Sequence, residues 1–280
     1  SDLVPLKEYS FDNRIYEKRV YRGFSNPKPE IELKFGPNIA DWPKMVALPD
    51  NILLKVASVI SDPVTTTDEL IPSGETSSYR SNPLKLAEFT LSRKEPQYVQ
   101  RAKAVQKIEQ ERRSIVAQNI DNPNISEALK EIMEKVKAHP QNKEMSIVDL
   151  LKNTGIGTVI FAVKPGDGSA REQAASCQKV LGGWANIANE YATKRYRSNL
   201  INWGMLPFTT EENANTRYQV GDYIWIPEIS KKIRESEEVI PAQIINDQGI
   251  NNIILYLKNL TNDEREIILK GSLINYYATQ

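Results

Sequence analysis

The sequence predicts an α/β fold, a layered sandwich of strands and helices with additional helices. Residues 156–163 form a short β-branched run typical of a buried strand, and residues 174–181 carry the apolar spacing of a buried helix face. Beyond residue 183, short apolar runs alternate with helical patterns. Strands separated by helices are typical of mixed α/β layers.

Proline punctuates the first part of the chain. Because proline denies ladder hydrogen bonds and stops helices, we expect residues 1–50 to be an extended linker or wrapping segment. Residues 51–280 are expected to form the main domain, which begins with a strand at 51–57. A long polar loop follows at 61–83, and a loop of that length inside a domain is often functional.

The middle of the chain is expected to be a helical insertion, at about 95–150. Residues 96–118 and 125–138 each place apolar side chains on one helical face, a pattern typical of packing surfaces. The remaining expected elements are strands at about 184–188, 222–226, 239–245 and 251–257, and helices at about 191–203, 228–234 and 261–270.

Composition excludes several classes of function. The chain has 280 residues, with 36 Lys and Arg against 36 Asp and Glu, so no net field attracts nucleic acid or an anionic membrane. No run approaches the ~20 apolar residues of a transmembrane helix. A single cysteine excludes a disulfide framework and fits a reducing compartment, so we expect a cytoplasmic protein.

The most informative motif is Gly-Asp-Gly-Ser-Ala-Arg-Glu-Gln at 166–173, between the strand and the helix. Its glycines permit positive φ and close approach of a ligand to the backbone. Ser169, Ala170 and Arg171 fall where unpaired N–H groups at a helix start favour an anion. These residues indicate a carboxylate or phosphate site; the alternative is a tight turn in which Ser169 caps the helix.

This motif resembles the Gly-Glu-Gly-Ser-Ser-Arg-Glu-His-Ala-Ala loop of the C-terminal swivelling domain of aconitases. The similarity continues through Leu-Gly-Gly at 181–183 and the Asn-Leu and Gly-Met-Leu-Pro segments at 199–207. Upstream, Thr-Asp-Glu-Leu-Ile-Pro-Ser-Gly at 67–74, followed by Tyr-Arg at 79–80, is similar to the family's Thr-Asp-His-Ile…Gly…Phe-Arg segment. The two motifs occur in the family's order, in a divergent bacterial form.

The resemblance implies a β/β/α swivelling domain. It also implies a hydro-lyase of the tricarboxylic acid cycle, which dehydrates and rehydrates a hydroxy-tricarboxylate or related hydroxy acid. It assigns Ser169 as the catalytic base, with Arg80 and Arg171 gripping substrate carboxylates, a task for which the planar guanidinium is suited. Each arginine taken alone has the alternative of a surface ion pair. Both motifs must reach one substrate, so we predict that Arg80 and Ser169 lie on one face of the domain.

Asp68 corresponds to a family residue that orients the active site, and we include it among the catalytic residues. The alternative, a side chain that caps or turns a Thr-rich loop, is common, and the sequence does not decide between the two. Three departures put citrate in doubt as the substrate. Ala170, at a substrate-binding position, replaces a serine, while Gln173 and Glu69 replace histidines.

The family's 4Fe–4S cluster is held by three cysteines in earlier domains, so the resemblance implies the N-terminal aconitase domains of the same parent chain as partners. Cys177 alone cannot replace them, and its apolar helical setting predicts an inert buried thiol. His139, the one histidine, is expected to be solvent-exposed rather than a metal ligand.

Two alternatives remain. A free-standing small subunit like that of isopropylmalate dehydratase would have little use for the proline-rich residues 1–50. The RNA-binding role of cluster-free aconitases would call for a basic and aromatic patch, and the balanced charge argues against it.

We predict that this chain alone binds no iron–sulfur cluster and has no hydratase activity, because one cysteine cannot supply three thiolates. Anaerobic reconstitution with iron and sulfide, followed by absorbance and an activity assay, checks this. A stoichiometric cluster absorbance would contradict the prediction.

Overall fold

The computed structural model describes two compact units, Ser1–Pro37 and Asn38–Gln280. In the first unit the helix α1 (Arg14–Arg19) interrupts the proline-rich region that was expected to be extended. Residues 38–50 belong to the second unit, where the Leu48 N–H donates to the carbonyl of Leu269 at 2.9 Å. The described residues are 10–19, 25–32, 34–119, 123–211 and 217–280.

A mixed sheet forms the centre of the second unit and closes on itself. Its order is β1-β3-β5-β6-β9-β8-β7, with the first four strands parallel and the last three antiparallel. The ring closes because β7 pairs antiparallel with β1. The strands are β1 (Asn51–Ile60), β3 (Thr154–Ala162), β5 (Gly183–Ala188), β6 (Leu206–Thr209), β7 (Tyr223–Ile226), β8 (Val239–Asn246) and β9 (Gly249–Tyr256).

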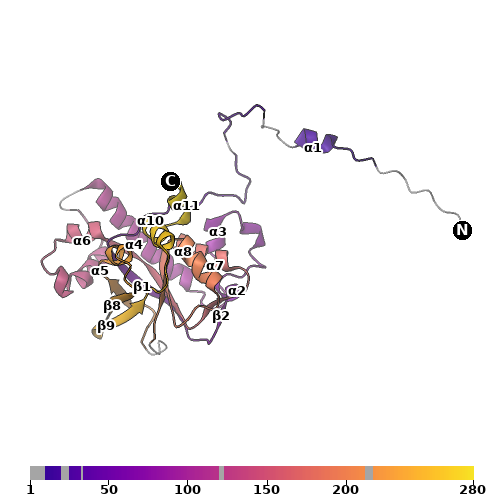
Figure 1. Cartoon of the computed structure of the whole chain (residues 1–280). Helices are drawn as coiled ribbons and strands as arrows, with labels where there is room; N and C mark the ends of the chain where they lie inside the picture. The colour runs from indigo at the N-terminus through magenta and orange to yellow at the C-terminus, as the bar shows by residue number, and fades with distance from the viewer. Residues whose placement is uncertain (1–9, 20–24, 33, 120–122, 212–216) are drawn as a thin grey trace. The chain divides into compact units, whose positions relative to one another are not determined.

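The α/β class with additional helices is therefore confirmed, and the expected sandwich is one sheet curled into a barrel. Figure 1 shows the helices in two groups beside the strands, α4 to α6 on one side and α3, α7 and α8 on the other. The helices are α2 (Thr67–Leu70), α3 (Pro83–Ala87), α4 (Tyr98–Gln118), α5 (Glu127–Lys137), α6 (Ile147–Asn153), α7 (Arg171–Val180), α8 (Lys194–Asn202), α9 (Ile229–Arg234), α10 (Asn262–Lys270) and α11 (Leu273–Ala278).

Three apolar clusters account for these layers. Alternation along β1 sends Ile52 and Leu54 to the cluster shared by the barrel strands, while Leu53 packs with α4, α5 and α6. A third cluster joins the far end of β1 to α3, α7 and α8. All of β3 is buried because it is covered on both faces, whereas β8 alternates between exposed and buried positions.

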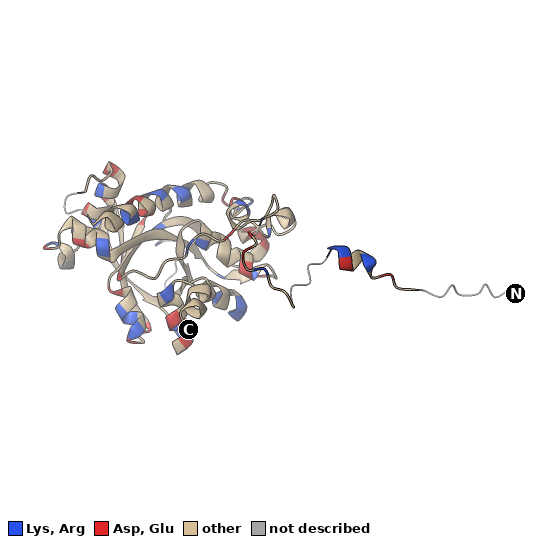
Figure 2. Ribbon diagram, turned by 90° about the horizontal axis from the view of Figure 1, so that it is seen from above, with Lys and Arg blue, Asp and Glu red and all other residues tan. Residues whose placement is uncertain are grey.

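Charged residues lie mainly outside this core. Figure 2 shows acidic and basic positions interspersed over the helices of residues 38–280, while the strands are mostly uncharged. None of the described helices is long and apolar enough to cross a bilayer.

A buried polar triad positions α7 against the barrel and α8. The Tyr196 hydroxyl donates to Asn186 Oδ1 at 2.8 Å and accepts from Gln178 Nε2 at 2.9 Å, and Asn186 Nδ2 donates to Gln178 Oε1 at 2.6 Å. Buried polar groups that satisfy one another in this way specify a single arrangement of their elements. The start of α7 is consequently held in place relative to β5 and α8.

His139 is 7 % exposed, so the expectation of a solvent-exposed histidine is wrong. It follows α5, whose Leu129, Ile132 and Met133 pack into the core, and it lines a pocket together with residues of β8 and β9. Burial lowers the pKa of His139. The expectation for Cys177 is confirmed: the thiol is buried, and burial raises its pKa to about 12.

The loops that follow β1 and β3 pair with each other. They form the short parallel strands β2 (Thr65–Thr66) and β4 (Pro165–Asp167). Gly166 and Gly168 have φ of +98° and +129°, as the sequence indicated. However, their missing side chains make room for the protein itself: a Cβ at Gly166 would meet the Tyr196 ring at 2.3 Å, and one at Gly168 would meet Thr67 Oγ1 at 2.3 Å.

We expect Gly168→Ala to lower the free energy of unfolding by about 1–3 kcal/mol, because the new methyl group clashes with Thr67 and the backbone is strained. Gly74→Ala is the matched control, since nothing lies within 4 Å of its added Cβ. Urea unfolding of both variants checks this. Equal losses would show that the Gly168 contact is not tight.

Candidate functional site

The pairing of β2 with β4 brings the two sequence motifs together. Thr65 lies opposite Pro165 and Thr66 opposite Asp167, and the Thr65 N–H donates to the carbonyl of Lys164 at 3.0 Å. Both strands continue from β1 and β3, which are parallel and end in register at Ile60 and Ala162. The motifs therefore leave the same edge of the sheet.

A pocket of about 210 Å³ lies between the two motifs. Arg80 and Ser169 both line it and both are exposed, which confirms the prediction that they share one face. Ala170 and Gln173, the two departures in the second motif, line it as well. The full lining is Ile71, Ser73, Thr76, Arg80, Leu86, Ser169, Ala170 and Gln173.

Ser169 does not cap α7, so that alternative is wrong. The N-cap position is occupied by Ala170, which has no side chain able to accept a hydrogen bond, and Ser169 precedes it. The first N–H groups of a helix without a side-chain cap remain available to another acceptor. The Ser169 hydroxyl thus lies in the pocket, next to the positive end of the helix dipole.

Arg171 begins α7 and is half-buried. Its Nε is buried and has no hydrogen-bond partner among the described residues. A buried donor left unpaired costs roughly 1–3 kcal/mol. Arg171 is not one of the residues that line the pocket, but it directly follows two that do, Ser169 and Ala170.

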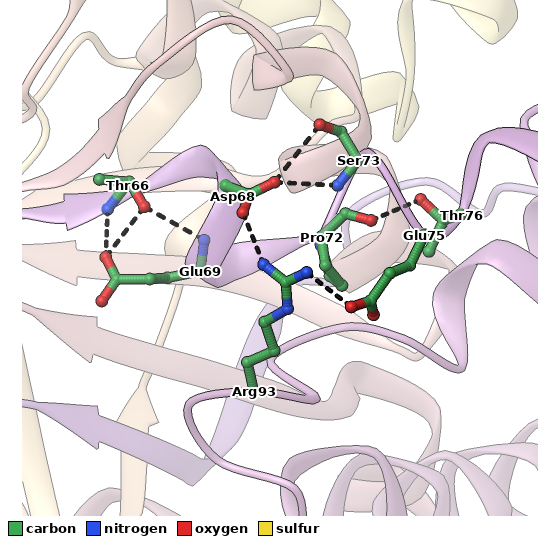
Figure 3. Close-up of polar contacts among 8 residues, drawn as sticks. All are labelled: Thr66, Asp68, Glu69, Pro72, Ser73, Glu75, Thr76 and Arg93. Atoms are coloured by element: carbon green, nitrogen blue, oxygen red, sulfur yellow. Dashed lines mark hydrogen bonds and ion pairs between the residues drawn. The ribbon is translucent and has the colours of Figure 1, made fainter.

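Asp68 holds the first motif in shape. Its Oδ1 accepts from the Ser73 N–H at 3.1 Å, and its Oδ2 accepts from Arg93 Nη1 at 2.9 Å. Figure 3 shows that Arg93 also reaches Glu75, at 2.6 Å, so one guanidinium bridges both sides of the turn. Asp68 is not among the pocket-lining residues; its contacts position Ser73, which is.

Glu69, where the family has a histidine, has a structural task. Its carboxylate accepts from the Thr66 N–H at 2.7 Å while its own N–H donates to Thr66 Oγ1 at 3.2 Å, a capping box for α2. Lys94 Nζ donates to its other oxygen at 3.1 Å. Burial acts to raise the pKa of Glu69, but the hydrogen bonds from Thr66 and Lys94 outweigh it and the pKa is lowered.

Sequence reasoning missed four residues of this region. Ser73 and Thr76 line the pocket, and Arg93 and Lys94 fasten the first motif from the segment between α3 and α4. The length and polarity of the loop at 61–83 could have indicated the first two. The basic pair carries no local signal, because its partners lie 25 positions away.

The described residues contain no group of three or more His, Cys, Asp or Glu side chains that could hold a metal ion. A 4Fe–4S cluster needs several thiolates, and the single cysteine, Cys177, is buried in the apolar cluster beside α7 with a raised pKa. This chain's own residues therefore do not fit such a cluster.

Comparison with known proteins agrees with the motifs. The model of the "Aconitase C-terminal domain" family matches residues 90–213. A 3-isopropylmalate dehydratase small subunit from Sulfolobus acidocaldarius is 32 % identical over 130 residues, which cover 46 % of this chain and 70 % of that protein. The chain belongs to the aconitase C-terminal domain family.

Aconitate hydratase A of Rickettsia bellii is 31 % identical over 147 residues, 49 % of this chain. The chain spans only 16 % of the length of this aconitate hydratase. A solved 3-isopropylmalate dehydratase structure from Methanocaldococcus jannaschii aligns with a TM-score of 0.46 and 21 % identity, over 82 % of this chain and 94 % of that one. The family model and the Sulfolobus relative confirm the resemblance to the aconitase C-terminal domain at the level of the family.

We expect Glu69→Ala to lower the free energy of unfolding by about 1 kcal/mol at pH 7, because the capping box and the contact with Lys94 are both lost. Because the folded-state pKa of Glu69 is lowered, its contribution is fully present above the usual 4.5 and is lost as the pH falls through the folded value. The difference between the variant and the parent should therefore shrink in acid.

Chemical denaturation at pH 7 and pH 3.5 measures this effect. Glu69→Gln should retain most of the stability, because glutamine also completes a capping box. The exposed Glu144, changed to Ala, serves as the control and should change stability by less than about 0.5 kcal/mol. A Glu69→Ala variant as stable as Glu144→Ala would contradict the assignment.

Proposed function

We propose that this chain is the swivelling domain of an aconitase-type hydro-lyase and contributes to the dehydration and rehydration of a hydroxy-carboxylate. The observation that carries the proposal is the convergence of Arg80 and Ser169 on one pocket at the start of α7. The buried Nε of Arg171, which has no hydrogen-bond partner among the described residues and directly follows Ala170 in the sequence, supports it. The names of the relatives, aconitate hydratase and isopropylmalate dehydratase, give the same reaction type.

In this proposal Arg80 and Arg171 bind carboxylates of the substrate. A guanidinium meets a carboxylate bidentately, and the pairing would satisfy the donor that Arg171 now leaves unpaired. The exposure of Arg80 leaves its guanidinium open to a ligand. Arg80 in the pocket wall and Arg171, next in sequence to Ala170 of the wall, would together favour substrates that carry more than one negative charge.

Ser169 is proposed as the base that removes a proton from a carbon next to a carboxylate. Its Oγ takes the proton when water is eliminated and returns it when water is added. A serine alkoxide is costly by itself, and the start of α7, with the neighbouring arginine, lowers that cost. Asp68 is proposed to act through the loop, since it positions Ser73 at the pocket wall.

The Lewis acid for the leaving hydroxyl is proposed to be a 4Fe–4S cluster held by other domains of the enzyme, because this chain's residues do not fit one. The N-terminal aconitase domains of a parent chain are the proposed partners. The substrate is proposed to differ from citrate, since Ala170 and Gln173 line the pocket in place of a serine and a histidine.

A free-standing small subunit is the second candidate. One observation favours it: the match covers 70 % of the Sulfolobus small subunit but only 16 % of the Rickettsia aconitate hydratase. In that case the cluster would be held by a separate, cysteine-rich chain. Co-purification of a separate cysteine-rich chain would favour the small subunit. Cysteine-rich domains in the same polypeptide would favour the domain of a longer enzyme.

In the assembled enzyme, we expect Ser169→Ala to lower kcat by roughly 100- to 10,000-fold with little change in KM, because a base acts only as the transition state forms. Arg171→Lys should lower kcat and raise KM by roughly 10-fold or more, because lysine cannot reproduce bidentate binding. Steady-state kinetics and melting temperatures of the same preparations check both.

Ser126→Ala is the matched control, since Ser126 caps α5 by accepting from the Leu129 N–H at 3.2 Å. It should cost about 0.5–2 kcal/mol of stability while kcat stays unchanged. Ser169→Ala should instead lower kcat while the stability stays nearly unchanged. Normal turnover in Ser169→Ala would remove the base from the mechanism.

A further inference from the structure

A second cavity, of about 160 Å³, lies at the other end of α7. Its walls come from α4, from residues 43–46, from the end of α7 and from β5. It shares no lining residue with the pocket at Arg80. A buried water needs only about 10–15 Å³, so the cavity has room for a small polyatomic ligand.

Lys179 is one of the residues that line this cavity. The residue is 8 % exposed, and its Nζ is buried with no hydrogen-bond partner among the described residues. Lys179 Nζ lies 4.0 Å from the centroid of the Trp184 ring, which stabilises the ammonium by a cation–π interaction. An ammonium has three donors, however, and the ring satisfies none of them as an oxygen would.

The one carboxylate in the lining is already saturated. Glu109 accepts from Arg112 Nε and Nη2 at 2.6 and 2.7 Å, from Arg113 Nε at 2.7 Å and from the Ile156 N–H at 2.9 Å. Two guanidinium groups thus share one carboxylate, and Lys179 adds a further positive charge. The cavity therefore has cationic donors in excess, and the carboxylate in its lining is already engaged.

We propose that this cavity binds a small oxyanion, which Lys179 Nζ and the guanidinium of Arg113 hold over the face of Trp184. Both cations line the cavity, and an oxyanion would supply acceptor oxygens to Lys179 Nζ, which has no hydrogen-bond partner among the described residues. Lys179 lies in the last turn of α7, where the helix dipole favours its charge over a neutral amine. Inorganic sulfate, inorganic phosphate and small carboxylates share the required chemistry.

Binding should depend on pH. Burial, together with the positive charge of Arg113, lowers the pKa of Lys179 to about 7. The anion needs the protonated amine, so affinity should be high below pH 7 and fall as the pH rises through that value. The charged groups that line the cavity with Lys179 are Glu109 and Arg113 from α4 and Lys44 from residues 43–46; Arg112 pairs with Glu109 outside the lining, and Ile156 of β3 and Trp184 of β5 do not titrate.

The test uses the full chain and sulfate, whose charge is constant between pH 6 and 8.5. Calorimetric titration should show binding that weakens several-fold over this range. Lys179→Met should weaken it by roughly 10- to 100-fold at pH 6. Titrations with phosphate and acetate tell an inorganic dianion from a carboxylate as the preferred ligand.

Two controls locate the site. Lys231→Met, on the exposed face of α9, and Arg80→Met, in the other pocket, should each leave sulfate affinity within about twofold of the parent. Unchanged binding in Lys179→Met would overturn the proposal, as would loss of binding in Arg80→Met. Absence of sulfate binding by the parent at pH 6 would overturn it without any variant.

Discussion

The parallel pairing of β1 with β3 is the constraint on which the rest of the site depends. Parallel strands end at the same edge of a sheet, and here Ile60 and Ala162 end in register. The two segments that follow these strands pair once more, as β2 and β4. The first then continues into α2 and the second toward α7. Motifs far apart in the sequence are thereby held within one pocket by backbone hydrogen bonds, with no need for a direct contact between their functional side chains.

Side chains around the two motifs hold the loops at this edge of the sheet in place. Arg93 bridges Asp68 and Glu75 across the first motif, and Thr67 packs where Gly168 has no side chain. Exposed ion pairs contribute little individually, but one guanidinium that joins two carboxylates restrains the loop geometrically. Positional precision of this kind is what a binding or catalytic constellation requires from its supports.

The two ends of α7 present different chemistry. At its start, the N-cap position is filled by an alanine, which cannot cap the helix with its side chain, and Ser169 lines a pocket with Arg80. In its last turn, Lys179 is buried against Trp184, and its amine has no hydrogen-bond partner in the part of the chain that the structure describes. The buried triad of Gln178, Asn186 and Tyr196 holds the helix between these ends, so that both are fixed relative to the barrel.

The sequence by itself determined the elements and the motif pair. β-branched runs and helical periodicity are local properties, so the strands β1, β3 and β5 and the helices α4 and α5 were predicted within a few residues. Only the tertiary structure decided the closure of the sheet through β7 and β1, the burial of His139, the clamp by Arg93 and the unpaired amine of Lys179. Each of these depends on residues distant in the chain, and local patterns carry no information about which distant partner a side chain will meet.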